Sequence, residues 1–350
     1  MKMSQTRESI FRTLFPQEPS FRWRQISHAL FDVSHSDWEG VTTLSLGMRT
    51  ALEEQVSWMS LRAAHVLESR RKDTVKALLE CADGARVETV LMKNRRGHWS
   101  VCVSSQVGCA MRCEFCATGA LGFSRNLSSD EIVDQYRFWN SFLARSATDG
   151  DSPEYISNIV FMGMGEPLAN YESVREAIRV ILSETSIGPT RITVSTVGLL
   201  PALRNLLNDS SWPSVRLAVS LHSADRDIRQ SIMPSTSPEF LDELARWANE
   251  YFRVNPSRRR HLTFEYVLLG GVNDSDGDME KLVRFSRRVG KVRINLIPYN
   301  ATGSRFAKSG REQECVVYLK RNGIPVTLRR TMGDDIAAAC GQLAGEKENC

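Results

Sequence analysis

The sequence predicts an α/β protein in which a small helical region and a β-hairpin precede a series of parallel strands joined by crossover helices. Apolar residues recur at three- and four-residue intervals through residues 1–85. From about residue 100, strand-like and helical stretches alternate in units of roughly thirty to forty residues, long enough for a helical crossover. Six such units are two short of a closed eight-stranded barrel, so the pattern alone fits a partial barrel and a doubly wound sheet equally well.

The N-terminal region is expected to contain helices followed by a β-hairpin. Helices are expected at 8–15, 23–31 and 46–69, where apolar side chains share one face. Residues 85–105 then contain two β-rich runs on either side of the polar turn Asn94-Arg95-Arg96-Gly97. This hairpin would connect the helical region to the parallel sheet.

The parallel strands are expected at 100–105, 156–165, 191–198, 215–223, 261–269 and 291–300. A helix over 128–143 begins with Ser128-Ser129-Asp130-Glu131, a capping box. Ligands of parallel α/β sheets bind at the carboxyl ends of the strands. We therefore expect the functional site at that edge, where most of the strands end in polar or glycine-rich motifs.

Composition limits the class of protein. With 42% hydrophobic and 25% charged residues, the chain is typical of globular proteins. It has neither a signal-like N-terminus nor about 18 consecutive apolar residues, so a cytoplasmic enzyme is expected. Eight cysteines without an even framework favour metal or redox chemistry in a reducing compartment.

Basic residues gather at several places in a chain of net charge +4. Such groups can bind phosphate backbones or simply form solvated surfaces. They are Arg70, Arg71 and Lys72; Lys93, Arg95 and Arg96; Arg258 to Arg260; Arg284, Arg287, Arg288, Lys291 and Arg293; and Arg329 and Arg330.

Cys109, Cys113 and Cys116 form a C-x3-C-x2-C motif directly after the first strand of the series. A structural zinc site normally has four ligands, often as two C-x2-C pairs, and here the second pair is missing. Three thiolates on a tight loop instead fit a [4Fe-4S] cluster with one iron left open to a small molecule. Zinc with a remote fourth ligand and unliganded thiols are the alternatives.

With Phe115 before the last cysteine and Gly-Glu after the second strand, this motif resembles that of the radical S-adenosylmethionine (SAM) enzymes. Nine segments in order resemble the RlmN/Cfr family of RNA adenine methyltransferases, from about Glu88 to Gly345 and more weakly before. They include CVSSQVGC, FMGMGEPLANY, SLHSADRDIRQSIMP, INLIPYN and GDDIAAACGQLAG. The resemblance implies a partial (βα)6 radical SAM barrel.

The resemblance also implies roles for individual residues. Cys109, Cys113 and Cys116 would bind the [4Fe-4S] cluster. In this superfamily the amino and carboxylate groups of SAM chelate the open iron, and electron transfer breaks a carbon–sulfur bond to give a 5'-deoxyadenosyl radical. Residues matching the SAM-binding positions offer a carboxylate, hydroxyls, an imidazole and an amide; they are Gly165, Glu166, Ser195, Ser220, Leu221, His222 and Asn300.

Three further residues would carry the chemistry that the resemblance implies. Cys340 would accept a methyl group from a first SAM as S-methylcysteine, and the radical from a second SAM would let that carbon add to the adenine ring. This route is needed because the ring carbon is not nucleophilic. Glu88 would accept the proton of the substituted carbon. Cys102 would then attack the sulfur of Cys340, forming a transient disulfide and releasing the methylated base.

The implied product is 2-methyladenine in 23S rRNA, with tRNA as a second candidate substrate. The segments SSQVGC and GEPLAN favour the RlmN branch over Cfr, which methylates carbon 8. A flavodoxin or ferredoxin would reduce the cluster, and a monomer without membrane attachment is expected. We expect a helical RNA-binding domain over 1–85, the radical SAM core with its hairpin and catalytic loop over 86–345, and a tail over 346–350.

Three segments depart from the family's pattern: Ser235 to Ser237 after Met233-Pro234, Ala301 to Ser304 after the last strand, and Ala337 in place of a usual aspartate. Every candidate catalytic residue is retained, so these changes concern the choice of substrate. Two other functions stay open. One is a radical SAM enzyme acting on another RNA, and the other is a noncatalytic RNA-binding protein whose cysteines hold zinc.

Overall fold

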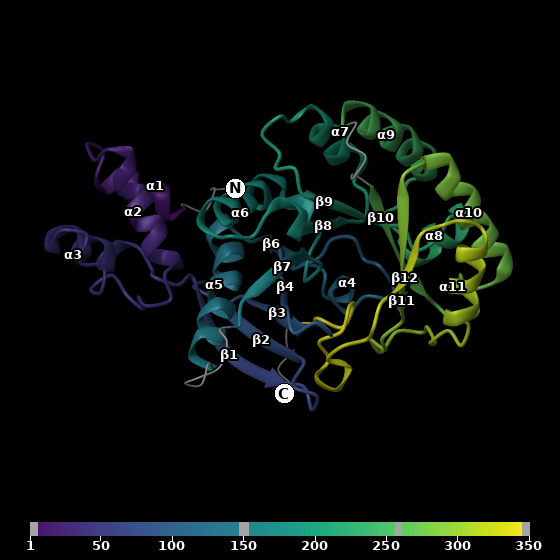
Figure 1. The fold of residues 1–350 in the computed structure, drawn as a ribbon, viewed down its shortest axis with the longest axis horizontal. Coiled ribbons are helices and arrows are strands. Elements are labelled where there is room, and N and C mark those ends of the chain that lie inside the picture. The colour runs from purple at the N-terminus through teal and green to yellow at the C-terminus, as the bar shows by residue number, and fades with distance from the viewer. Residues whose placement is uncertain (1–5, 147–153, 256–260, 345–350) are drawn as a thin grey trace.

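The computed structural model describes residues 6–146, 154–255 and 261–344 (Figure 1). The expected tail over 346–350, residue 345 and the basic group Arg258 to Arg260 lie outside these residues. No helix in the described ranges is long and apolar enough to cross a membrane. The first elements are α1 (Arg7–Leu14), α2 (Ser20–Phe31), α3 (Leu46–Gln55), β1 (Leu61–Glu68), β2 (Thr74–Cys81), β3 (Arg86–Lys93) and β4 (Trp99–Cys102).

The strands that follow β4 alternate with helices, as expected. Glu131 and Ser128 form the predicted capping box of α5, with N–H to oxygen distances of 3.1 and 2.7 Å. The elements are β5 (Gln106–Gly108), α4 (Ala117–Leu121), β6 (Phe123–Asn126), α5 (Ser129–Ser146), β7 (Ile156–Phe161), α6 (Tyr171–Glu184), β8 (Ile192–Thr196), α7 (Leu200–Asn208), β9 (Arg216–Ser220), α8 (Arg226–Ile232), α9 (Phe240–Val254), β10 (Leu262–Leu268), α10 (Asp276–Val289), β11 (Val292–Pro298), α11 (Glu312–Arg321) and β12 (Val326–Leu328).

One large sheet organises the molecule, in the order β1-β2-β3-β4-β7-β8-β9-β10-β11-β12. The strands β1 to β4 pair antiparallel, and every later pair is parallel. Parallel neighbours follow the chain order without the reversal that marks a doubly wound sheet. Figure 1 shows the helices α6, α7, α9, α10 and α11 around the outside of these strands. The partial barrel is therefore confirmed, with the predicted hairpin β3–β4 in front of it.

The helical prediction for the end of the N-terminal region is wrong. Instead of one helix over 46–69, α3 ends at Gln55 and β1 begins at Leu61, and β2 follows where the region was still expected to be helical. The segment LRAAHVLE contains good helix formers, yet β1 pairs with β2 along its length. Long-range strand pairing has overridden local propensity here. The hairpin is thus part of a four-stranded antiparallel extension of the barrel sheet.

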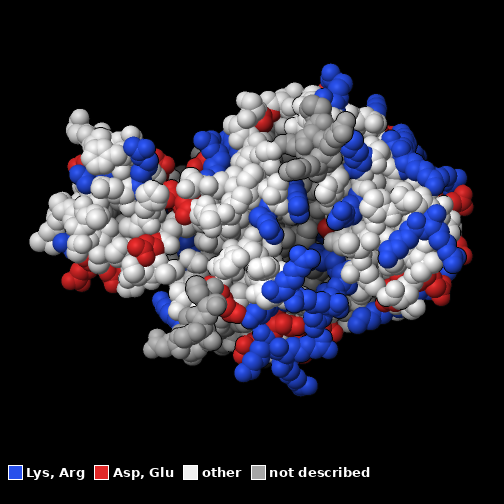
Figure 2. Space-filling model, in the orientation of Figure 1, with Lys and Arg blue, Asp and Glu red and all other residues white. Residues whose placement is uncertain are grey.

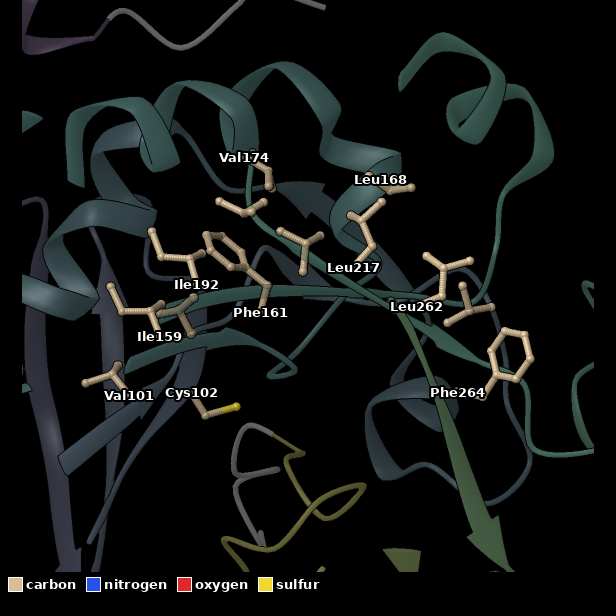
Figure 3. Packing of buried hydrophobic residues seen from close by; sticks show 14 of the residues in the cluster. Val101, Cys102, Ile159, Phe161, Leu168, Val174, Ile192, Leu217, Leu262 and Phe264 are labelled. Carbon is tan, nitrogen blue, oxygen red and sulfur yellow. The ribbon is translucent and has the colours of Figure 1, made fainter. Parts of the chain in front are cut away.

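Apolar side chains of successive strands form the core beneath the helices. Figure 3 shows Val101, Ile159, Ile192 and Leu217 packed together, with Val174 of α6 above them. All five are at most 2% exposed. Close packing of this kind fixes the carboxyl ends of the strands relative to one another. The N-terminal helices have a separate hydrophobic cluster around Phe11, Ile26, Trp38 and Leu52.

A buried ion network attaches the N-terminal helices to α5. The fully buried carboxylate of Asp134 pairs with Arg7 of α1 and with Arg137, the latter at 2.5 Å. Arg137 also donates to the carbonyl of Leu30 at the end of α2, at 2.6 Å. Buried charges of this kind are tolerated only when they are paired. The network therefore determines how the helical region sits on the barrel.

Candidate active site

The three motif cysteines lie on the loop between β5 and α4. Burial raises the pKa of Cys109 to about 12, and burial together with the neighbouring Cys116 and Cys109 raises that of Cys113. The N–H of Cys116 donates to the carbonyl of Cys113 at 3.1 Å, which closes the loop. A Cβ on Gly119 would lie 2.8 Å from that same carbonyl, so only glycine fits there. The loop thus gathers one buried thiol, that of Cys109, and two partly buried thiols, those of Cys113 and Cys116, close enough to influence one another.

These thiols fit an iron–sulfur cluster better than a single ion. In the described ranges, no three His, Cys, Asp or Glu side chains are arranged to hold one metal ion. Each thiolate of a [4Fe-4S] cluster binds a different iron, so three cysteines need not converge on one point. With a cluster bound, three cysteine ligands would leave a fourth iron open to a small molecule.

Gly165 and Glu166 follow β7 and lie beside the cysteine loop. Gly165 has φ +99°, and a Cβ there would lie 2.5 Å from the Cβ of Gln106. The Glu166 carboxylate accepts hydrogen bonds from the N–H groups of Leu168 (2.9 Å) and Val197 (2.8 Å). A carboxylate has further acceptor capacity, so Glu166 can join two loops and still face a cationic amine.

The ends of β8 and β9 supply the next predicted residues. The hydroxyls of Ser195 and Ser220 lie 3.5 Å apart, and Leu221 is fully buried with its N–H bonded to the carbonyl of Glu265 at 3.0 Å. Two small hydroxyl side chains at adjacent strand ends can donate to a ribose or a carboxylate.

His222 adopts φ +54° directly after β9. Its Nδ1 accepts the N–H of Val267 at 3.0 Å, so the imidazole proton is on Nε2. Burial, with the charge of Arg229, lowers the pKa of His222 to about 3. The ring edge meets Phe115 of the cysteine loop, with centroids 4.8 Å apart. His222 is therefore a neutral donor that also packs against the cysteine loop.

Glu88 lies on β3 and is 2% exposed. Its Oε1 pairs with the ammonium of Lys76 at 2.7 Å, and its Oε2 accepts the N–H of Ala344 at 2.7 Å. The C-terminal loop, residues 333–344, thus reaches the side chain that the sequence suggested as a proton acceptor. The loop also bonds to the cysteine loop, since the N–H of Ala117 donates to the carbonyl of Gly341 at 2.8 Å.

Cys102 and Cys340 are brought together although they are 238 positions apart in the sequence. Burial, followed by the charge of Cys340, raises the pKa of the Cys102 thiol to about 12, and Arg329 opposes the rise. In Figure 3 the Cys102 sulfur points away from the core residues. Both thiols are free, so the disulfide that the resemblance implies is absent from this structure.

Cys340 borders a cavity of about 200 Å³ at the carboxyl ends of the strands. Asn300 donates its amide to the Cys340 carbonyl at 3.1 Å. Basic side chains gather in the centre and lower part of the face in Figure 2, the region where the C-terminal loop runs in Figure 1. The cavity is lined by Met92, Ile297, Pro298, Asn300, Arg329, Arg330, Thr331, Met332, Ala338, Ala339 and Cys340.

Three residues of the site carried no specific signal in the sequence. Lys76 lies in a segment predicted as helix, and Glu265 is in the middle of an apolar run. Arg329 belonged to a basic pair for which phosphate binding and a solvated surface were both open, but its guanidinium lies 3.8 Å from Glu265 and faces the thiols of Cys102 and Cys340. The strand register that brings these residues together depends on long-range pairing.

Three clustered cysteines at the mouth of a partial barrel, with polar groups on the adjoining strand ends, define a radical SAM protein. The model of the Radical SAM superfamily matches residues 103–285, which include the cysteine loop and strands β7 to β10.

Similar proteins identify the family within the radical SAM superfamily to which the chain belongs. A dual-specificity RNA methyltransferase RlmN from Syntrophobacter fumaroxidans is 41% identical over 337 residues, covering 94% of this chain and 93% of the relative. A probable dual-specificity RNA methyltransferase RlmN from Chlorobium phaeobacteroides is 40% identical over 339 residues, covering 94% and 90%. The crystal structure of a radical SAM methyltransferase from Sphaerobacter thermophilus has a TM-score of 0.85 at 37% identity, covering 97% and 98%. The chain belongs to the RlmN family of radical SAM RNA methyltransferases.

Proposed function

We propose that this protein methylates carbon 2 of an adenine in 23S rRNA and also acts on tRNA, consuming two SAM per methyl group. Relatives 38 to 41% identical to the chain are dual-specificity RNA methyltransferases. The segments SSQVGC and GEPLAN favour carbon 2 over the carbon 8 chemistry of Cfr. The basic surface around the C-terminal loop suits a phosphate backbone.

Cys109, Cys113 and Cys116 would hold the [4Fe-4S] cluster. Gly165, Glu166, Ser195, Ser220 to His222 and Asn300 would hold SAM beside it. When bound, this pair of cofactors supplies an electron and a carbon radical. The chain's part is to orient the cofactors and to keep water away from the radical, which the buried packing of Phe115 on His222 favours.

The remaining steps belong to side chains. The sulfur of Cys340 would carry the methyl carbon, as a carbon radical, to the base. Glu88 would remove the proton from the substituted ring carbon, and the unpaired electron left on the ring would return to the bound cofactors. The Cys102 thiolate would attack the Cys340 sulfur, so that an S–S bond forms as the sulfur–carbon bond breaks. The electron pair passes to the carbon, which takes up a proton to become the methyl group. An external dithiol would then reduce the disulfide before the next turnover.

The observation that carries this proposal is the position of Cys340. Its charge influences both Cys116 of the cysteine loop and Cys102 of β4, and its loop bonds to Glu88. The contacts of one loop with the proposed radical source, the proposed resolving thiol and the proposed base therefore support this assignment of roles. A noncatalytic zinc protein would have no use for such a convergence.

Mass spectrometry of nucleosides tests the proposal. Anaerobically reconstituted protein is incubated with SAM, a reductant and 23S rRNA or tRNA from a strain lacking the gene. We expect 2-methyladenosine in both RNAs and about four irons per chain. Formation of 8-methyladenosine would assign the protein to the Cfr chemistry. Zinc without iron would contradict the proposal. We further propose a cytoplasmic monomer whose cluster is reduced by a flavodoxin or ferredoxin.

A further inference from the structure

Lys76 is a buried cation inside the site. It lies in the middle of β2 and is 8% exposed. Lysine is rarely buried unless its charge is paired, because removing an ammonium from water costs several kcal/mol. A lysine at this position therefore needs a reason beyond packing.

Lys76 shares a face of the sheet with both side chains of the proposed release step. It lies opposite Val90 of β3, and Val90 lies opposite Cys102 of β4. Glu88 is two residues before Val90, and side chains two apart on a strand point to the same face. Lys76, Glu88 and Cys102 therefore lie on one face, the face that the C-terminal loop covers.

The ion pair between Lys76 and Glu88 holds the C-terminal loop on both sides of Cys340. The Lys76 ammonium donates to the carbonyl of Ala337 at 3.4 Å, three residues before Cys340. The Glu88 carboxylate accepts the N–H of Ala344 at 2.7 Å, four residues after Cys340. Ala337 also adopts φ +49°, which is costly for a residue with a Cβ, so this loop conformation depends on its contacts.

We propose that Lys76 is a positioning residue that couples the seating of the Cys340 loop to the readiness of Glu88 as a base. Its charge orients the carboxylate through Oε1 and holds the loop through the Ala337 carbonyl. When the loop is seated, the base and the methyl-carrying sulfur are therefore in place together. This inference rests on the proposed roles of Glu88 and Cys340.

Two readouts test Lys76. The first is the fraction of protein found as covalent RNA adduct during turnover, measured on denaturing gels. The second is the rate of Cys340 alkylation by iodoacetamide in protein without cofactors, measured by peptide mass spectrometry. For Lys76→Met we expect about a tenfold rise in adduct, because base catalysis typically contributes a hundredfold or more. Alkylation should rise severalfold as the loop loosens.

Lys76→Arg keeps the charge and should move both readouts back toward wild type. Lys281→Met is the matched control, since Lys281 lies on α10 and pairs with Asp225 at 2.6 Å, away from the C-terminal loop; it should behave as wild type. If Lys76→Met melts below the assay temperature, Lys76→Gln is measured instead. The proposal is overturned if Lys76→Met changes only one of the two readouts or neither. It is also overturned if Lys76→Arg does not move the adduct fraction and the alkylation rate back toward wild type.

Glu88→Gln separates this inference from the function on which it rests. It should accumulate adduct by itself, and adding Lys76→Met should raise the adduct no further, because the lysine acts through the carboxylate. If Glu88→Gln turns over without adduct, the proposed role of Glu88 is wrong. If Glu88→Gln stalls and Lys76→Met does not, only the role of Lys76 is wrong.

Discussion

Asn300 donates its side-chain amide to the backbone carbonyl of Cys340, at 3.1 Å, and accepts the hydroxyl of Thr331 at 3.0 Å. A residue matched to SAM binding therefore supports the loop of the proposed methyl carrier as well. The contact links the end of β11 to the C-terminal loop across the cavity.

Replacing Asn300 by alanine should loosen the Cys340 loop. A hydrogen bond of this kind contributes about 1 kcal/mol, which corresponds to roughly a fivefold change in an equilibrium. We expect Cys340 to be alkylated about fivefold faster in the Asn300→Ala protein without cofactors. Asn322→Ala, at the end of α11, is the control and should leave the rate unchanged. An unaltered rate in Asn300→Ala would mean that this contact does not hold the loop.

The cysteines should separate into two classes by their iron content. Cys113→Ala removes one of three proposed ligands and should yield a colourless protein with little iron after anaerobic purification. Cys340→Ala should retain the full iron content and the brown colour, yet transfer no methyl group. Loss of iron from Cys340→Ala would instead make Cys340 a ligand.

The release step should accelerate with pH. Burial raises the pKa of Cys102 to about 12, so the attacking thiolate is scarce at neutral pH and its fraction grows about tenfold per pH unit below that value. We expect adduct decay, followed in single turnover, to speed up between pH 7 and 9. A rate that is flat over this range would show that Cys102 deprotonation does not limit release.

Arg329 lowers the pKa of Cys102, against burial and the charge of Cys340. Arg329→Met should therefore slow adduct decay at a fixed pH, and Arg329→Lys should slow it less. Rapid-quench gels at pH 8 compare the three proteins. Equal decay rates would mean that the guanidinium does not act on the thiol.

The ion pairs of Asp134 should make a large contribution to the free energy of unfolding. Burial raises the pKa of its carboxyl, but Arg7 and Arg137 outweigh burial and lower it to about 2. Because the folded pKa lies below the ordinary value, this stabilisation is present above pH 4 or so and is lost as the pH falls toward 2. Asp134→Asn removes the carboxylate that pairs with buried Arg137 and leaves buried Arg7 with only the longer Asp130 pair at 3.6 Å, at a cost of about 3 to 5 kcal/mol.

Thermal melts at pH 7 measure this effect. Asp134→Asn should lower Tm by about 5 °C or more. Asp242→Asn, which breaks a half-exposed pair with Arg288, should change it little. Similar Tm values for both variants would contradict the role given to the buried network.

The sequence predicted the barrel well because its strands are apolar, regularly spaced and followed by polar motifs. The capping box of α5 and the hairpin β3–β4 were local patterns of the same kind. The strands β1 and β2 were missed because their residues favour helix locally, and only pairing with β3 makes them strands.

The residues of the candidate site also divide into those marked by local sequence motifs and those brought together only by long-range pairing. Residues in motifs, such as Cys113 and Glu166, could be named from the sequence. Lys76 could not, because its importance depends on a register that places it beside Glu88 and on a loop that arrives from the other end of the chain. Arg329 resembled a surface cation until the structure placed it beside the thiols of Cys102 and Cys340.

In the proposed mechanism, Cys340 carries the methyl carbon and Cys102 releases the product. The most direct test is Cys102→Ala with SAM, reductant and RNA, followed by digestion and peptide mass spectrometry of the cross-linked species. We expect this protein to stall as a covalent adduct joining Cys340 to an adenine through one carbon. Normal turnover of Cys102→Ala without any cross-linked species would contradict it.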